Sequence, residues 1–257
     1  MYEYEGLQDV IFIALYCVAA FAALLACVYL LCRRGNAFMQ EKGPESVKTI
    51  ETPNGPLRLG SGVRSSLRLR RWTAALMAAI VGSHVWWYVL GQVWLTDDRL
   101  VRNIIAIALD HVTLVPLTMA VLLAMLQDRH RPLWPWLVAE VSAVVVTAVM
   151  GIAGRDEFWG YDVLGYCQLA LIAGFIVYYA LALRHYGRWL RDNYADLEHK
   201  EVWQSLTFAV ALFVVYEVYT SNGGELLREY LSQIVTLVII AFLLWRVETL
   251  QELKDEA

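Results

Sequence analysis

Seven long apolar stretches constrain this chain more than any other feature of its sequence. They occupy residues 10–31, 72–95, 104–126, 133–152, 161–183, 202–220 and 231–245. Each is near the roughly 20 residues that a helix needs to cross the hydrocarbon core of a bilayer. The sequence therefore predicts an all-α integral membrane protein with seven transmembrane helices, forming one membrane domain over residues 1–257.

The composition agrees with a membrane protein of this kind. Hydrophobic residues make up 59% of the chain and charged residues only 18%, a balance that excludes an ordinary soluble domain of this size. The first apolar stretch follows an acidic leader and is too long for the core of a signal peptide, so we expect it to stay as an anchor. The four cysteines have no metal-ligand spacing and are expected to pack within the spans.

Basic residues predict the orientation of the spans. If the N-terminus lies outside, all but four of the 21 Lys and Arg residues fall on the inner side. The four exceptions are Arg99, Arg102, Arg155 and Arg228. The positive-inside rule then places the N-terminus outside and the C-terminus in the cytoplasm.

The one long inner loop, residues 33–71, carries a turn signal and a basic end. Its run SVKTIETPNGPLRLG alternates in the manner of β-strands on both sides of Asn54-Gly55, which predicts a short β-hairpin. The run RSSLRLRRW meets the membrane and is typical of a topology anchor attracted to anionic headgroups. So short a patch does not predict contact with nucleic acid.

A charged stretch follows the fifth span and predicts a cytoplasmic helical extension over residues 184–201. Apolar residues recur there at helical spacing, at Leu190, Tyr194 and Leu197. Opposite charges stand four residues apart in two pairs, Arg188 with Asp192 and Asp196 with Lys200. The extension presents either a solvated charged face or a docking surface for a cytoplasmic domain.

The span at residues 104–126 is the one around which the others are expected to gather. Asp110 and His111 interrupt it, and Pro116 follows. A charge at the centre of a span costs roughly 2.5–3.5 kcal/mol on insertion scales, and a buried Pro needs neighbours for the carbonyl it frees. This span is therefore expected to face other spans. In the first span, Ala19, Ala23 and Cys27 predict close packing, either within the bundle or at a dimer seam.

Five ionisable residues lie within the spans: His84, Asp110, His111, Glu140 and Glu217. At about 1.5 Å per residue, Asp110 and His111 lie roughly 10 Å below the outer surface, Glu217 about as shallow, and Glu140 in the inner half. One outward-facing cavity is predicted to hold a small ligand. Its predicted members are Asp110, His111, His84, Glu217, Gln168, Gln233 and Tyr216.

Two other uses of these polar residues stay open: contacts between helices, and the passage of protons or metal. Adjacent residues on a helix point about 100° apart, so Asp110 and His111 cannot both face one partner. Alanine at Asp110 and Glu217 is expected to weaken a ligand response while leaving folding largely intact. A proton-coupled transporter using Asp110, Glu140 and Glu217 is the main rival, although no internal repeat supports a carrier.

Several enzyme and cofactor classes find no support in the sequence. No lysine lies in any of the seven stretches, which excludes a retinal Schiff base, and the chain has no HExxH, GxSxG, CxxC or Gly-rich phosphate loop. His84 and His111 differ in depth, which argues against a haem between them. We therefore expect no catalytic residue, no cofactor and no metal site.

Four runs near the end of the chain are similar to a known family. They are WLRDNYADLEHKEVWQSL at 189–206, YTSNGG at 219–224, REYLSQ at 228–233 and IIAFLLWRVETLQEL at 239–253. Together they resemble the membrane-embedded N-terminal region of AraC-type transcription regulators of Bacteroidetes. In that family a multispan region precedes a cytoplasmic helix-turn-helix DNA-binding domain, whereas this chain stops at Ala257 without one.

The resemblance implies a sensor module in a bacterial inner membrane. Its expected partners are the lipid bilayer, an unknown small ligand, and a cytoplasmic effector or DNA-binding domain absent from this chain. A homodimer is implied by analogy, and direct nucleic-acid binding by these residues is not. The signal is expected to leave through residues 246–257, as the start of an output helix, and through five charged residues. These are Arg188, Arg191, Asp192, Asp196 and Arg246.

Overall fold

The computed structural model describes residues 7–33, 48–52, 55–59, 65–92, 99–153, 160–194, 197, 200–220 and 225–253. These residues form seven helices and two strands. The helices are α1 (Leu7–Cys32), α2 (Leu67–Gln92), α3 (Arg99–Met125), α4 (Trp134–Ala153), α5 (Gly160–Asn193), α6 (Trp203–Thr220) and α7 (Glu225–Thr249). The strands are β1 (Lys48–Thr52) and β2 (Gly55–Leu59).

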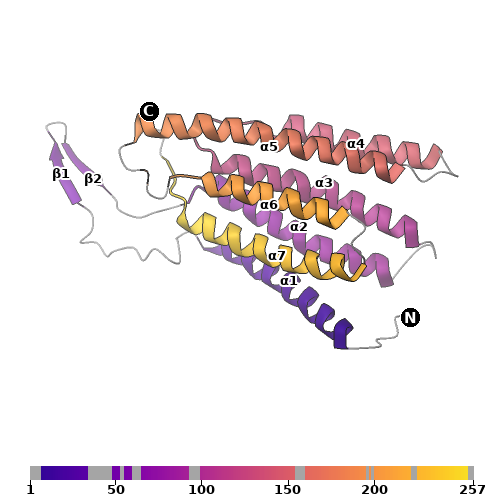
Figure 1. The fold of residues 1–257 in the computed structure, drawn as a ribbon. Coiled ribbons are helices and arrows are strands. Elements are labelled where there is room, and N and C mark those ends of the chain that lie inside the picture. Colours follow the sequence, from indigo (N-terminus) through magenta and orange to yellow (C-terminus); the bar gives the residue numbers. More distant parts are fainter. Residues whose placement is uncertain are drawn as a thin grey trace.

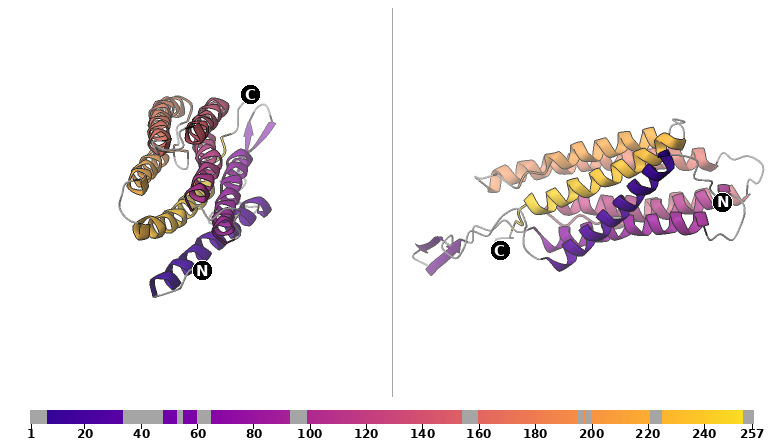
Figure 2. Two further views of the ribbon diagram at one scale, coloured as in Figure 1. Left: turned by 90° about the vertical axis from the view of Figure 1, so that its right-hand side faces the viewer. Right: turned by 90° about the horizontal axis from the view of Figure 1, so that it is seen from below.

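The seven helices run side by side in one bundle (Figure 1). Each helix packs against the next along the chain, and α7 also packs against α1 and α2, which closes the arrangement (Figure 2). We call the end of the bundle at which α1, α3, α5 and α7 finish the C-end, and the opposite end the N-end. The hairpin lies beyond the C-end in Figure 1.

The helices have the length and the surface of membrane helices. Among the described residues, α1, α2, α3, α5 and α7 each contain a segment long and apolar enough to cross a membrane. Large apolar side chains on their outer faces are exposed, as Phe21, Leu25, Val177 and Val238 illustrate. Lipid can cover such a surface without cost, whereas water cannot. The protein is therefore a helical membrane protein.

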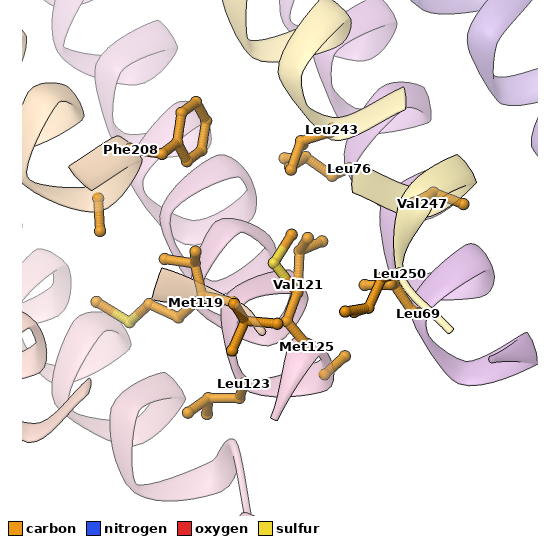
Figure 3. Packing of buried hydrophobic residues seen from close by; sticks show 14 of the residues in the cluster. Leu69, Leu76, Met119, Val121, Leu123, Met125, Phe208, Leu243, Val247 and Leu250 are labelled. Carbon is orange, nitrogen blue, oxygen red and sulfur yellow. The ribbon is translucent and has the colours of Figure 1, made fainter. Parts of the chain in front are cut away.

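The apolar core is concentrated toward the C-end (Figure 3). Every residue from 119 to 126 is buried, so the last two turns of α3 are enclosed on all sides. Leu76 of α2 and Leu243 of α7 pack in the same core, and Phe208 stacks on Phe242 with ring centroids 4.1 Å apart. The end of the span at 104–126 therefore faces other helices, whereas Ile105 and Leu109 in its first part are exposed.

The small residues of α1 pack inside the chain. Ala19 and Ala23 are fully buried, and α1 lies against α2 and α7. Small side chains at four-residue spacing let helix backbones approach closely. Of the two alternatives, packing within the bundle is the one that these two residues support.

Helix α4 begins deeper in the bundle than its sequence position suggests. Residues 126–133 are not helical, and within them the Arg131 guanidinium donates to both carboxylate oxygens of Asp128 at 2.5 and 2.8 Å. Trp136, in the first turn of α4, packs on Phe175 and Tyr178 of α5 at centroid distances of 5.1 and 5.4 Å. At about 1.5 Å per residue, this contact lies roughly 10 Å inside the predicted end of the fifth span.

Two predicted cytoplasmic elements differ from the structure. Helix α5 continues only to Asn193, so the helical extension covers 184–193 and the described residues after it are not helical. Helix α7 ends at Thr249, and residues 250–253 are not helical, which makes the predicted helical exit wrong over these residues. The side chain of Gln127 explains the second difference. Its Nε2 donates to the carbonyl of Gln251 at 2.9 Å, and the Leu253 N–H donates to its Oε1 at 2.8 Å.

The hairpin differs from its prediction in register. The strands are antiparallel, and Thr52 pairs with Gly55. Gly55 therefore belongs to β2 and not to the turn that the Asn54-Gly55 signal predicted. The two residues between the strands lie outside the described part of the chain.

We expect Gln127→Leu to release the segment after α7. The change removes both hydrogen bonds to residues 251 and 253, each worth about 0.5–1.5 kcal/mol net. Hydrogen exchange measured by mass spectrometry should become faster in the peptide that contains Leu253. Gln204→Leu is a matched control, because the Gln204 Oε1 has no hydrogen-bond partner among the described residues. Equal exchange in wild type and Gln127→Leu would show that the contact does not hold the segment.

Candidate functional site

Asp110 of α3 is held by three donors from α2. Its carboxylate accepts hydrogen bonds from Ser83 Oγ at 2.7 Å, Trp87 Nε1 at 2.8 Å and Trp86 Nε1 at 3.2 Å. Residues 83, 86 and 87 share one face of α2 because three- and four-residue spacing follows the helical repeat. The two oxygens of Asp110 are thus engaged within the bundle. This geometry supports a contact between helices as the role of Asp110.

His84 of α2 connects three helices. Its Nδ1 lies 2.8 Å from the carbonyl oxygen of Ile80, and its Nε2 lies 3.0 Å from Gln233 Oε1 of α7. The Tyr16 hydroxyl of α1 donates to the His84 carbonyl, and the two rings lie 4.6 Å apart. Both ring nitrogens are occupied by partners in the bundle. We call Asp110, His84 and Gln233 with their donors the tethering cluster.

A second cluster joins α3, α4 and α5. Gln168 Nε2 donates to Glu140 Oε1 at 2.5 Å, and His111 Nδ1 lies 3.6 Å from the same oxygen. Glu140 and Gln168 are 0% exposed, and the His111 side chain is 12% exposed. The Tyr216 ring of α6 meets the His111 ring edge-on at a centroid distance of 6.2 Å. We call His111, Glu140 and Gln168 the buried triad.

The buried triad has polar atoms without partners, which separates it from the tethering cluster. Glu140 Oε2, Gln168 Oε1 and His111 Nδ1 have no hydrogen-bond partner among the described residues. A buried polar atom left unpaired costs about 1–3 kcal/mol, so each such atom calls for an unseen proton, ion, water or ligand. Three such atoms on three helices make the triad the better candidate for a binding site.

The predicted single cavity is thus two clusters in the structure. Asp110, His84 and Gln233 belong to one, while His111, Gln168 and, at its edge, Tyr216 belong to the other. Asp110 and His111 face different neighbours, as their adjacent positions on one helix predict. The side chain of Glu217 lies outside the described part of the chain.

Glu140 is the residue that the sequence-based site missed. The depth estimate placed it in the inner half of the membrane because it assumed that α4 begins at the inner surface. Helix α4 begins beside Phe175 and Tyr178 instead, which brings Glu140 level with Gln168. Its charge was the sequence feature that could have indicated a place in the site, since Glu140 is the one carboxylate in the apolar stretch at residues 133–152.

The predicted output residues divide between surface and interior. Arg188, Arg191 and Asp192 are exposed on the extension of α5, and the Arg191 Nε donates to the Gly187 carbonyl at 3.1 Å. Arg246 is buried and donates to the Glu201 carbonyl at 2.7 Å, so it is an interior contact and not a surface residue. Asp196 lies outside the described residues.

A buried ion pair at the C-end was not predicted. Arg70 of α2 and Glu248 of α7 are 3% and 1% exposed, with Nη1 and Oε1 3.4 Å apart. The Tyr29 hydroxyl donates to the same Glu248 oxygen at 2.8 Å, and Arg70 also donates to the Arg33 carbonyl at 2.7 Å and to Ser65 Oγ at 3.1 Å. The basic run around Arg70 predicted headgroup contact, and Glu248 was placed in a cytoplasmic helix. Only folding brings them together.

Comparisons with known proteins add no identification. The chain matches no protein-family model, no curated protein and no solved structure. The resemblance to the sensor region of AraC-type regulators therefore stays a prediction.

Proposed function

We propose that this chain is a seven-span membrane sensor module that binds a small ligand at the buried triad. In this proposal the N-end faces outside and the C-end faces the cytoplasm of a bacterial inner membrane. The bound state would be passed to a cytoplasmic effector, as the resemblance to AraC-type transcription regulators implies. No catalysis is part of this function.

Helix length and charge support the seven-span topology. Helices α4 and α6 have 20 and 18 residues, or about 30 and 27 Å, which is close to the thickness of the hydrocarbon core. All seven helices then span the bilayer, and consecutive helices alternate in direction. Among the described residues, most Lys and Arg side chains lie at or beyond the C-end, which is the distribution of a cytoplasmic side.

The single observation that carries the proposal is the set of three unpartnered atoms of the buried triad. They belong to α3, α4 and α5, so a ligand that pairs with some of these atoms, or displaces another from Glu140, favours one packing of these helices over another. A ligand shifts such an equilibrium only by its difference in affinity between the two packings. The atoms that change from unpaired to paired provide that difference.

Contacts from α3 offer a route from the triad to the C-end. Helix α3 carries His111 near its middle, and Gln127 follows its end and holds Gln251 and Leu253. A small shift of α3 against its neighbours therefore moves the segment after α7. Shifts of about 1–2 Å between packed helices are a common form of switching. The exposed charges on the extension of α5, at the same end, would contact the effector.

We expect Glu140→Gln to change the structure at the C-end although the two places lie far apart in the chain. The protein in lipid nanodiscs should show altered hydrogen exchange in the peptide that contains Leu250 and Leu253. Thr236→Val is a matched control, because Thr236 lies in a span and donates to the Ser232 carbonyl at 2.8 Å. If Glu140→Gln folds and leaves exchange at the C-end unchanged, the triad does not signal to the cytoplasmic side.

A proton-coupled transporter is the second candidate, and one observation favours it. His111 Nδ1 and Glu140 Oε1 lie 3.6 Å apart within the spans, where ionisable pairs often mark proton relays. Proteoliposomes with an entrapped pH indicator separate the two functions, since a sensor moves no protons. Proton flux in the wild type that is absent in Glu140→Gln would show that the protein is a transporter and not a sensor.

A further inference from the structure

We infer that the buried triad binds a small monovalent metal cation, for which Na⁺ is the appropriate probe. This inference rests on the binding site of the proposed function and names the class of its ligand. It is carried by the oxygen atoms of the triad, by the charge of Glu140 and by the closure of the site.

The two free oxygen atoms of the triad are ligands that a hard cation prefers. Glu140 Oε2 and Gln168 Oε1 are a carboxylate and an amide oxygen, each fully buried and without a partner among the described residues. Carboxylate and carbonyl oxygens select hard metal ions, whereas thiolates and imidazoles select softer ones. The Gln168 amide nitrogen is already used by Glu140 Oε1, and its oxygen has no partner among the described residues.

Charge balance favours a monovalent ion. Glu140 is the only carboxylate in the triad, and the neighbours that it meets are a histidine and an amide. A single positive charge makes the ionised site neutral, while a divalent ion would leave a net charge in the low-dielectric interior of the membrane. His111 competes with the ion, because its Nδ1 lies 3.6 Å from Glu140 Oε1 and a protonated imidazole would neutralise the same carboxylate.

The closure of the site limits the ligand to a small one. Glu140 and Gln168 are 0% exposed and 2.5 Å apart at their nearest atoms, so a large organic cation does not fit between them without separating α4 from α5. No three His, Cys, Asp or Glu side chains meet anywhere in the described part of the chain, so the triad also lacks the usual donors of a zinc site.

His111 and Tyr216 mark the accessible side of the triad. The 12% exposure of His111 makes it the one member that is not fully enclosed. Tyr216, which packs on His111, also lines a hollow of about 210 Å³ between α6 and α7, together with Ser232. The exposed part of the triad is therefore the His111 ring.

Thermal unfolding of the purified protein in detergent tests the inference. We expect the melting temperature to rise saturably in NaCl relative to choline chloride at the same concentration, by about 5 °C when the site is filled. Glu140→Gln keeps the shape of the side chain but removes its charge, and it should abolish the rise. Asp110→Asn is the matched control, since Asp110 is the half-buried carboxylate of the tethering cluster, and it should keep the rise.

Several results would overturn the inference. Equal melting temperatures in NaCl and choline chloride would do so, as would a sodium-dependent rise that persists in Glu140→Gln. A melting temperature that responds to pH and not to Na⁺ would show that a proton occupies Glu140. A larger rise in CaCl₂ at matched ionic strength would replace the monovalent ion by a divalent one. If Glu140→Gln does not fold, equilibrium dialysis of wild type and Gln168→Leu with radioactive sodium decides, with one ion per chain expected in wild type only.

The sodium-binding experiment and the hydrogen-exchange experiment on Glu140→Gln can fail separately. If Na⁺ stabilises the wild type but Glu140→Gln leaves hydrogen exchange at the C-end unchanged, the ion site is supported and the sensor function is contradicted. If Glu140→Gln changes hydrogen exchange at the C-end but Na⁺ does not stabilise the wild type, the sensor function is supported and the cation is contradicted as its ligand.

Discussion

Replacing Arg70 by Met is expected to destabilise the bundle by about 3–5 kcal/mol, because it removes the guanidinium that lies 3.4 Å from the buried Glu248 carboxylate. Glu248 is 1% exposed, so water cannot replace the guanidinium. The Tyr29 hydroxyl still donates to Glu248, but a neutral donor does not replace the charge of a guanidinium. Unfolding in mixed micelles, followed by tryptophan fluorescence or far-UV circular dichroism, measures the change in free energy.

Two variants make this prediction specific to the ion pair. Arg71→Met removes an adjacent charge from an exposed position and should change the free energy of unfolding by less than about 0.5 kcal/mol. The double variant Arg70→Met/Glu248→Leu removes both charges and should recover most of the loss. If Arg70→Met is no worse than Arg71→Met, the pair does not hold α2 to α7.

Replacing Asp110 by Leu is expected to cost about 2–5 kcal/mol of stability. The change removes three hydrogen bonds between α2 and α3, which in membranes average about 0.6 kcal/mol each and reach about 1.7. It also leaves the indole N–H groups of Trp86 and Trp87 without their acceptor. The free energy of unfolding in micelles measures the loss, and the fluorescence maximum of the protein should shift because two indoles change environment.

A graded series tests whether the three donors explain the loss. Asp110→Asn keeps one oxygen acceptor, which can serve Ser83 and Trp86 but turns an amide N–H₂ toward Trp87, so its loss should be intermediate. Ser83→Ala removes one bond and should cost least. Equal stability of Asp110→Leu and Ser83→Ala would show that the carboxylate does not organise this contact.

These results would also correct the sequence-based view of Asp110. That view expects alanine at Asp110 to weaken a ligand response while leaving folding intact. The geometry reverses this expectation, because both oxygens of Asp110 are engaged by α2, whereas Glu140 Oε2 has no partner among the described residues. We therefore expect Asp110 variants to lose stability and Glu140 variants to lose the response.

The sequence by itself determined the helices and their order. The apolar stretch at 202–220 became α6 at Trp203–Thr220, and the stretch at 10–31 became α1 at Leu7–Cys32. Apolar length is a local property, and a membrane helix must satisfy its backbone hydrogen bonds within itself, so each stretch forms a helix whatever its neighbours do. The burial of Pro116 in α3 was also predictable, since a Pro within a span needs neighbouring groups for the carbonyl it frees.

The tertiary structure alone decided which polar groups meet. The axial position of α4 depends on the packing of Trp136 against Phe175 and Tyr178, and this offset brings Glu140 to Gln168. The end of α7 likewise depends on Gln127, which lies more than 120 residues earlier in the chain. Rotation and offset of one helix against another arise from side chains distant in sequence, and no local pattern records them. Apolar length defines the spans, whereas interhelical packing defines the site.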